Sequence, residues 1–320
     1  MKILITGHAG FIGYHLAKSL LKKKFFVVGI DNFNSYYDKK IKYKRLKSLL
    51  SVSKNKFKNY KLDLTDTKKI DHLFKKYKFK YVVHLAAQAG VRFSINNPEN
   101  YFKSNIQGTF SILNISKKYK IKHLIIGSSS SVYGNSKKFP LSENFNTDHP
   151  ESFYAASKKS SEIMSFAYSN IYKIPITVLR FFTVYGPNGR PDMSLYKFSD
   201  LITKNKKIPI YNNGNHDRDF TYIDDVIFYI TNLINKIPNT KVPFRLLNVA
   251  NGKTNKLRDF LKYIQIYIGK KAKIKKLPIQ KGDVLKTHAD IRKLNKIIKP
   301  KNKTEIKIGV KKFIDWFKSK

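Results

Sequence analysis

The stretch that decides the fold is Lys2-Ile3-Leu4-Ile5-Thr6-Gly7-His8-Ala9-Gly10-Phe11-Ile12-Gly13, near the start of the chain. Its apolar run is typical of a buried parallel strand. Gly7 permits a tight turn, Gly10 lets the backbone approach a pyrophosphate, and Gly13 lets the next helix pack close to the strand. A helix that begins near Phe11 directs its first N–H groups at the phosphates. The stretch therefore predicts a dinucleotide-binding turn.

A carboxylate follows at the position that such a turn requires. The apolar run 26–30 ends at Asp31, which lies after Gly13 by nearly the roughly 20 residues typical of the acid that binds the adenosine ribose. A carboxylate there would repel a 2′-phosphate, so the sequence favours NAD over NADP. A glycine-rich surface turn, the alternative, does not explain the strand, the helix and the acid together.

The first 180 residues alternate strand and helix patterns, which predicts an α/β fold with a doubly wound parallel Rossmann sheet. Strands are expected near 2–6, 26–30, 57–62, 80–86, 122–128 and 176–182. Helices are expected near 11–23, 39–50, 66–76, 98–119 and 152–172, and later near 224–236 and 310–317. We expect an NAD-binding domain over 1–185. A smaller α/β region over 186–320 would mostly bind substrate, with segments crossing back.

A second motif indicates chemistry at this sheet. Tyr154 and Lys158 are four residues apart, so on a helix they share one face. A free tyrosine has a pKa of about 10, and a neighbouring ammonium would favour its phenolate at neutral pH. Ser128–Ser131 follow an apolar strand, at the edge where open α/β sheets bind ligands. With Ser129 hydrogen-bonded to the reacting oxygen, this pattern indicates redox chemistry on an alcohol carbon.

With these motifs the chain resembles the extended short-chain dehydrogenase/reductases and their NAD-dependent epimerase/dehydratase family. Within that family it is most similar to the bacterial UDP-glucuronate 4-epimerases. The matching segments are TGHAGFIG (6–13), DNFNSYYD (31–38), HLAAQAGVRFSI (84–95), SSSSVYG (128–134), YAASKK (154–159), RFFTVYGPNGRPDM (180–193), RDFTYIDDV (218–226) and GDVLKTHADI (282–291). The glycine and Tyr-x-x-x-Lys motifs are shared by the superfamily, whereas DNFNSYYD, AGVRFS and FFTVYGPNGRPDM indicate the uronic-acid epimerases.

The resemblance implies a role for each matching residue. Tyr154 would be the catalytic base, Lys158 its partner and Ser129 the assisting hydroxyl. The residues that would hold NAD are Gly7, Gly10, Phe11, Ile12, Gly13, Asp31, Asn32, Asp63, Leu64, Leu85, Ala86, Ala87, Tyr154 and Lys158. The residues that would meet the substrate are Arg92 and Ser129 near the sugar, Thr183 and Arg190 at its carboxylate, and Arg218 at the UDP phosphates. For the arginines, a surface ion pair is the alternative interpretation.

The implied reaction is C4 epimerisation of a UDP-sugar, UDP-glucuronate to UDP-galacturonate, through a 4-keto intermediate with retained NAD. Such a reaction would serve polysaccharide biosynthesis. A 4-epimerase for UDP-glucose or UDP-N-acetylglucosamine and a UDP-glucuronate decarboxylase remain open. One departure from the family leaves the substrate range open, because Asn188 stands where relatives often carry a bulky aromatic residue.

Other classes fit the sequence less well. A 4,6-dehydratase needs an acid/base pair beside the assisting hydroxyl, and Ser130 and Ser131 supply no carboxylate. A non-catalytic NAD-bound regulatory protein would not need Ser129, Tyr154 and Lys158. The family also implies a homodimer, formed through the helices expected near 98–119 and 152–172.

Composition bounds the remaining possibilities. The chain has 320 residues and no cysteine, so disulfides, thiolate catalysis and cysteine metal sites are excluded. Its 8 histidines show no ligand spacing, and we expect no metal site. No apolar run reaches the roughly 18 residues of a membrane span, and no signal peptide is recognised, so a cytoplasmic protein is expected.

The charge balance raises the question of nucleic acid. Lysine and arginine number 64 against 21 acidic residues, a formal net charge of +43. The lysines are spread along the chain rather than gathered in a stripe, which indicates compositional bias. We therefore expect no specific nucleic-acid partner, although the positive field would attract an anionic sugar nucleotide.

Overall fold

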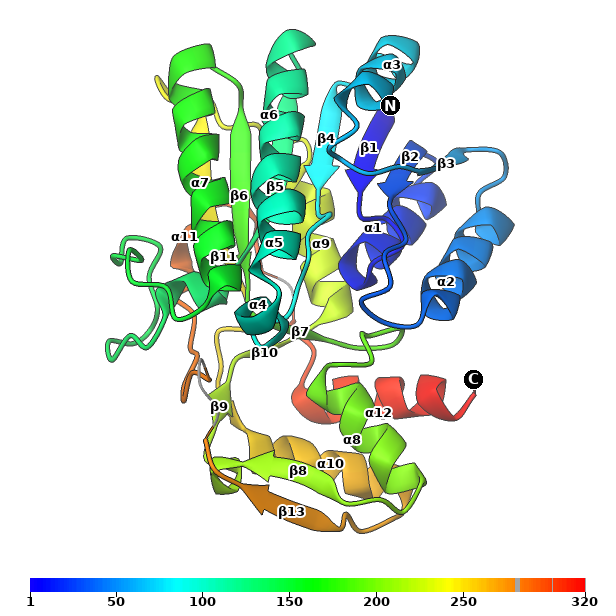
Figure 1. The fold of residues 1–320 in the computed structure, drawn as a ribbon, viewed down its shortest axis with the longest axis vertical. Helices are drawn as coiled ribbons and strands as arrows, with labels where there is room; N and C mark the ends of the chain where they lie inside the picture. Colours follow the sequence, from blue (N-terminus) through cyan, green and yellow to red (C-terminus); the bar gives the residue numbers. More distant parts are fainter. Residues whose placement is uncertain (280–282, 301, 320) are drawn as a thin grey trace. The chain divides into compact units, whose positions relative to one another are not determined.

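The computed structural model describes residues 1–279, 283–300 and 302–319, which form two compact units (Figure 1). The first unit comprises residues 1–134, 143–181 and 227–247. The second comprises residues 135–142 and 182–226 and the described residues from 248 onward. The chain thus leaves the first unit for residues 135–142 and again after residue 181, and it returns at residues 143 and 227. Gly282, which opens the segment 282–291, lies outside the described residues.

A seven-stranded sheet forms the centre of the first unit, in the order β11-β6-β5-β4-β1-β2-β3. The pairs from β6 through to β3 are all parallel. The strands are β1 (Lys2–Thr6), β2 (Phe26–Asp31), β3 (Phe57–Lys61), β4 (Tyr81–His84), β5 (His123–Ser129), β6 (Ile176–Phe181) and β11 (Phe244–Val249). The six strands expected from the sequence occur with nearly the expected ends. The doubly wound α/β fold is therefore confirmed.

Helices cover this sheet because their apolar faces match those of the strands. The main helices of the first unit are α1 (Phe11–Lys22), α2 (Lys39–Val52), α3 (Thr67–Tyr77), α6 (Gly108–Lys118) and α7 (Phe153–Tyr172). One buried cluster joins Leu4, Val82 and Ile126 of the strands to Phe74 of α3 and Ile112 of α6. Figure 1 shows α6 and α7 in front of β5 and β6. Helix α1 packs on β1 and β2, with α2 beside it.

Side-chain caps fix where these helices begin. Asp38 accepts a hydrogen bond from the Lys40 N–H at 2.8 Å at the start of α2. At the start of α7, Ser152 accepts one from the Ala155 N–H at 3.1 Å. Such caps satisfy N–H groups that have no partner inside the helix. The cap at Ser152 places Tyr154 in the first turn of α7.

The helix expected over residues 98–119 contains a π-helical turn. The structure has α5 (Pro98–Tyr101), a π-helical turn over Phe102–Gln107 and then α6. Within the π turn, the buried Asn105 side chain bonds to both backbone groups of Gln88, as described below. The expected helix is therefore confirmed over residues 98–118, and the π turn in its middle is a feature that the sequence did not predict. Single π turns inside helices are frequent at functional sites.

The second unit is built from short pairs of strands and helices. Its strands are β7 (Thr183–Tyr185), β8 (Ile208–Tyr211), β9 (Asp217–Arg218), β10 (Phe220–Tyr222), β12 (Asn255–Lys256) and β13 (Ile274–Leu277). Its helices are α8 (Ser194–Thr203), α10 (Leu257–Ile268), α11 (Arg292–Ile297) and α12 (Ile306–Lys318), while α9 (Ile223–Leu233) begins here and continues into the first unit. The rings of Phe220 and Phe260 stack at 4.3 Å in the core. The helix expected near 310–317 occurs as the longer α12, which buries Val310, Phe313 and Ile314.

Candidate active site

The glycine turn after β1 has the close approaches expected of it. Gly7 has a φ of +75°, and a Cβ there would lie 2.8 Å from the Ala86 backbone nitrogen. A Cβ at Gly13 would lie only 2.1 Å from the Gly7 carbonyl oxygen. Phe11 and Ile12 begin α1 directly after Gly10. The turn therefore fits a dinucleotide, because its glycines have no side chains to keep a pyrophosphate from the backbone and because the start of a helix follows.

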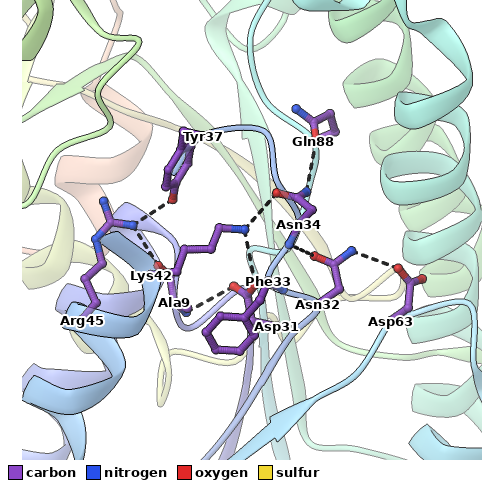
Figure 2. Close-up of polar contacts among 10 residues, drawn as sticks. All are labelled: Ala9, Asp31, Asn32, Phe33, Asn34, Tyr37, Lys42, Arg45, Asp63 and Gln88. Atoms are coloured by element: carbon purple, nitrogen blue, oxygen red, sulfur yellow. Dashed lines mark hydrogen bonds and ion pairs between the residues drawn. The ribbon is translucent and has the colours of Figure 1, made fainter. Parts of the chain in front are cut away.

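Asp31 lies beside this turn at the end of β2 (Figure 2). Its carboxylate accepts hydrogen bonds from the Ala9 N–H at 3.3 Å and from the Phe33 N–H at 2.8 Å. The side chain is 6% exposed. The acid thus lies next to the glycine turn, and its contact with the hydroxyls of an adenosine ribose stays a prediction.

Two cationic residues in this region were missed by the sequence analysis. Lys42 lies 3.6 Å from the Asp31 carboxylate, and Arg45 donates to the Ala9 carbonyl at 2.8 Å and to the Tyr37 hydroxyl at 2.9 Å (Figure 2). Both side chains are buried. They stand on α2, which also carries exposed lysines, so composition gave no signal that these two face inward.

Asn32 and Asp63, both expected to hold NAD, also meet. Asn32 donates to the Asp63 carboxylate at 2.9 Å. Burial acts to raise the pKa of Asp63, but hydrogen bonds from Asn32 and Thr65 outweigh it and hold the pKa below its usual value. Asp63 therefore stays ionised and remains a strong acceptor. Leu64, next to it, is buried in the hydrophobic core.

The loop after β4 borders the glycine turn. The N–H groups of Leu85 and Ala86 donate to the Thr6 hydroxyl at 3.2 and 3.1 Å. Gly7 also lies so close to the Leu85–Ala86 backbone that it leaves no room for a Cβ, so residues 85–87 and the glycine turn lie side by side. The structure therefore brings the two predicted cofactor segments together.

The residues expected to be catalytic lie at the carboxyl end of β5. Lys158 of α7 donates to the Gly127 carbonyl at 2.8 Å, which fixes the lysine beside Ser128 and Ser129. Burial lowers the pKa of Lys158 to about 8, and the nearby Glu162 carboxylate opposes that shift. Tyr154 lies one turn earlier on α7 and is half-buried. Its ring packs edge-on against that of Tyr101 at 6.0 Å.

A buried ion pair supports this strand end, and the sequence analysis did not single it out. Arg180 of β6 contacts both carboxylate oxygens of Glu162, at 2.9 and 2.7 Å. Glu162 also accepts a hydrogen bond from the Ser128 hydroxyl at 2.6 Å. Ser129, the next residue, accepts from the Ser131 N–H and hydroxyl. The pair thus joins α7, β5 and β6 behind the expected catalytic residues.

The π-helical turn reaches the same helix. Asn105 accepts from the Gln88 N–H at 2.7 Å and donates to the Gln88 carbonyl at 3.0 Å and the Ser157 hydroxyl at 2.8 Å. Ser157 in turn donates to the Tyr154 carbonyl. Asn105 therefore links the loop after β4 to the turn that carries Tyr154. A lone asparagine in a helical pattern offers no sequence signal for this role.

No metal centre is evident in the part of the chain that the structure describes, where no group of three or more metal-binding side chains gathers. His84 is buried between the Thr6 and Thr109 hydroxyls, at 2.7 and 3.1 Å. Burial, and then the charge of Lys158, lowers the pKa of His84 to about 3, so its ring is neutral. Among the described helices, none combines the length and apolarity of a membrane span.

The predicted substrate residues are divided between the two units. Arg92 belongs to the first unit and is exposed just before α4 (Phe93–Asn96). Thr183, Arg190 and Arg218 belong to the second. Arg190 forms a bidentate pair with Asp192, at 3.0 and 2.5 Å, in the loop after β7. This is the ion pair that the sequence analysis held as the alternative.

Arg218 and Thr183 lie near one buried acid of the second unit. The Thr183 N–H donates to the Asp219 carbonyl, and Arg218 donates to the Leu285 carbonyl at 2.9 Å. The Asp219 carboxylate accepts from the N–H groups of Asn251, Gly252 and Ala289. Burial raises the pKa of Asp219 to about 6, although these bonds oppose the shift. Asp219 thus anchors two loops next to Arg218, one at Asn251 and Gly252 and one at Ala289.

Comparisons with known proteins agree with this geometry. The family model described as GDP-mannose 4,6 dehydratase matches residues 4–313. Protein CapI of Staphylococcus aureus is 44% identical over 331 residues, covering 99% of this chain and 98% of that protein. UDP-glucuronate 4-epimerase of Thermodesulfobacterium geofontis is 40% identical over 317 residues, covering 98% and 95%. The crystal structure of UDP-glucuronic acid 4-epimerase from Bacillus cereus with UDP-glucuronic acid and NAD has a TM-score of 0.93 at 32% identity, covering 100% of this chain and 99% of that one.

Replacement of Gly13 by alanine tests the glycine turn. The new Cβ would meet the Gly7 carbonyl at 2.1 Å, so α1 must move and the turn must open. We expect Gly13→Ala to release most of the dinucleotide that the purified protein retains, measured by chromatography after denaturation. Gly108→Ala is the matched control, because its Cβ meets only ordinary contacts at 3.4 Å in α6. Equal retention in both variants would contradict the prediction.

Proposed function

Since the chain belongs to the family described as GDP-mannose 4,6 dehydratase, we propose that it is an NAD-dependent UDP-sugar 4-epimerase. The proposed reaction interconverts UDP-glucuronate and UDP-galacturonate. The observation that carries this proposal is the buried Lys158 at the end of β5, with Tyr154 on the same helix face and Ser129 at the strand end. The two relatives named as UDP-glucuronate 4-epimerases support the choice of sugar.

Tyr154 is the proposed base. Its phenolate removes the proton of the C4 hydroxyl, and Ser129 donates a hydrogen bond to the same oxygen. Lys158, held by the Gly127 carbonyl, supplies the positive charge that favours the phenolate. When Tyr154 returns the proton after the sugar has turned about its diphosphate, the opposite C4 epimer forms.

When bound, NAD would supply the hydride acceptor for C4 of the sugar and would give the hydride back in the same cycle. The glycine turn, Asp31, and the Asn32–Asp63 pair would hold this cofactor. Because the cofactor is restored in each cycle, the protein has no need to release it. Asp31 is buried at the end of β2, and the half-buried Asn32 and Asp63 are bonded to each other in the loops that follow β2 and β3.

A clamp for the sugar carboxylate is proposed at Thr183 and Arg190. The 4-keto intermediate of a uronic acid is a β-keto acid, which can lose CO₂. The site must therefore hold the carboxylate away from the geometry of decarboxylation. An arginine fork suits this task, since it binds a carboxylate through two parallel hydrogen bonds. Arg190 makes such a pair with Asp192 in the structure.

The first test is turnover without added cofactor. The purified protein is incubated with UDP-glucuronate, and the sugar is followed by NMR. UDP-galacturonate should appear, and Tyr154→Phe should lower the rate by roughly 10²- to 10⁴-fold, the usual worth of a general acid–base group. Turnover of UDP-glucose or UDP-N-acetylglucosamine alone would refute the uronic-acid substrate. Release of CO₂ with a pentose product would refute epimerisation in favour of decarboxylation.

The clamp is tested by Arg190→Ala with two substrates. The variant should lose about 100-fold in kcat/KM with UDP-glucuronate, because a bidentate charge-assisted contact is removed. With UDP-glucose the loss should stay below about threefold, since that sugar carries no carboxylate. Arg292→Ala is the matched control, because Arg292 also pairs with an aspartate two residues away, Asp290, and its side chain is 82% exposed. Equal losses on both substrates would remove Arg190 from the clamp.

The assembly that we propose is a homodimer. Large apolar side chains are exposed along the π turn, α6 and α7, where Phe102, Phe110, Ile163, Phe166 and Ile171 are 46 to 64% exposed. Contiguous exposed apolar groups on a soluble protein indicate an interaction surface. Two copies of this face would pair as a four-helix bundle.

Sedimentation of a charged variant tests the dimer. Ile163 is 57% exposed on α7, so Ile163→Glu should leave the fold intact and shift the protein from dimer to monomer. Ile308→Glu is the control, because Ile308 is 47% exposed on α12, a helix of the second unit that is not part of the proposed dimer surface. A wild-type protein that sediments as a monomer at micromolar concentration would refute the assembly.

The remaining proposals concern location and charge. The absence of cysteine suits a cytoplasmic protein, and we propose that location. The high positive charge follows from composition, and its proposed consequence is attraction of the anionic UDP-sugar rather than specific nucleic-acid binding.

A further inference from the structure

Helix α2 carries a lysine that is almost fully buried beside the expected ribose site. Lys42 is 5% exposed, whereas Lys39, Lys40 and Lys44 on the same helix are exposed. A buried ammonium is costly unless polar and anionic groups surround it. Burial lowers the pKa of Lys42, and the Asp31 carboxylate is the charge that opposes this shift.

The contacts of Lys42 all involve the loop after β2 (Figure 2). Its Nζ donates to the Asn34 side-chain oxygen at 2.9 Å and lies 3.6 Å from Oδ1 of Asp31. It also lies 5.4 Å from the centre of the Tyr37 ring. The amide of Asn34 also donates to the Gln88 side-chain oxygen at 3.2 Å, so Asn34 links Lys42 to the loop after β4. Lys42 therefore joins Asp31 at the end of β2 to Asn34 in the loop that follows.

The Asp31 carboxylate is held from three sides. The Ala9 and Phe33 N–H groups donate to its two oxygens, and Lys42 lies beside one of them. An ionised carboxylate has about four acceptor positions, so capacity remains for ribose hydroxyls. With both oxygens already bonded, the carboxylate cannot turn away from the ribose.

The same arrangement has a second property. Two backbone N–H groups and an ammonium converge on Asp31, and such a set of donors would suit a phosphate equally well. In this chain the carboxylate fills that place with its own negative charge. A 2′-phosphate on the adenosine ribose would be repelled by Asp31 and attracted by Lys42. The carboxylate is therefore the element that excludes the phosphorylated dinucleotide.

We propose that Lys42 is a positioning residue that holds Asp31 and Asn34 against the adenosine ribose, and that it is a latent partner for a 2′-phosphate once the Asp31 carboxylate is removed. Lys42 and Asp31 together then set the choice between NAD and NADP. This inference rests on the proposed function only for the identity of the cofactor.

A competition experiment tests the pair. Each full-length variant is dialysed against equal concentrations of NAD and NADP until the bound ratio is constant, and the released dinucleotides are quantified after denaturation. The wild type should hold NAD. Asp31→Ser, which shortens the side chain and removes its charge, should raise the NADP-to-NAD ratio by about tenfold or more. Asp31→Ser combined with Lys42→Met should lose most of that gain.

Matched variants separate positioning from folding. Lys42→Met alone should retain less NAD without gaining NADP, and Lys42→Arg should restore NAD retention in part. Lys44→Met, on the exposed face of α2, should change neither the ratio nor the retention, alone or combined with Asp31→Ser. Thermal unfolding of each variant reports the fold, and a merely structural loss would lower both dinucleotides in proportion.

Three outcomes would overturn the inference. In the first, the double variant Asp31→Ser/Lys42→Met holds as much NADP as Asp31→Ser alone. In the second, Asp31→Ser gains no NADP. In the third, Lys42→Met retains NAD like the wild type. None of these depends on turnover. A protein that shows the expected ratios but epimerises no UDP-sugar would refute the proposed reaction and leave the role of Lys42 standing.

Discussion

The first unit depends on the close approach of α1 to the turn after β1. With 2.1 Å between a Cβ at Gly13 and the Gly7 carbonyl, no side chain other than hydrogen fits there. This contact fixes the direction of α1, and with it the N–H groups that face the turn. The Arg45–Ala9 hydrogen bond and the Ala9–Asp31 hydrogen bond then tie α2 and β2 to the same turn. One steric constraint thus sets the geometry of the cofactor region.

The carboxyl end of β5, where the candidate catalytic residues lie, depends instead on a buried ion pair. Glu162 and Arg180 neutralise each other inside the unit, and the Ser128 hydroxyl satisfies a further lone pair. A buried pair of this kind contributes little net stability, but loss of one partner is strongly destabilising. Its value here is positional, because it locks α7 to β5 and β6 where Lys158 and Tyr154 must stand. Rigid support of this kind holds reacting groups in productive orientation.

Most of the fold could be predicted from local patterns in the sequence. Apolar strands bounded by glycine, serine or aspartate predicted the sheet, and the family to which the motifs pointed is confirmed by the comparisons. The π turn escaped prediction, because the hydrogen bonds of Asn105 to Gln88 join distant segments and leave no periodic trace.

The buried lysine of α2 escaped for another reason. In a chain with 64 basic residues, one inward-facing lysine cannot be told from its solvated neighbours by residue type alone. Arg45 was hidden in the same way, and Glu162 was not singled out within the helix expected over residues 152–172. These residues become visible once tertiary contacts are known, because burial of charge is a property of the fold and not of the local pattern.

The Arg190–Asp192 pair has a consequence for how the loop after β7 discriminates among anions. The guanidinium already holds a carboxylate of its own chain, so any incoming anion exchanges one ion pair for another and gains only the difference. Because Arg190 is already paired with Asp192, its net affinity for an incoming anion is lower than that of an unpaired arginine. Simple anions with poor geometry fail to displace Asp192. A carboxylate delivered on a tethered nucleotide has a high local concentration and can do so. In the clamp that we propose, Asp192 would therefore be replaced by the carboxylate of a bound sugar acid and not by a free anion.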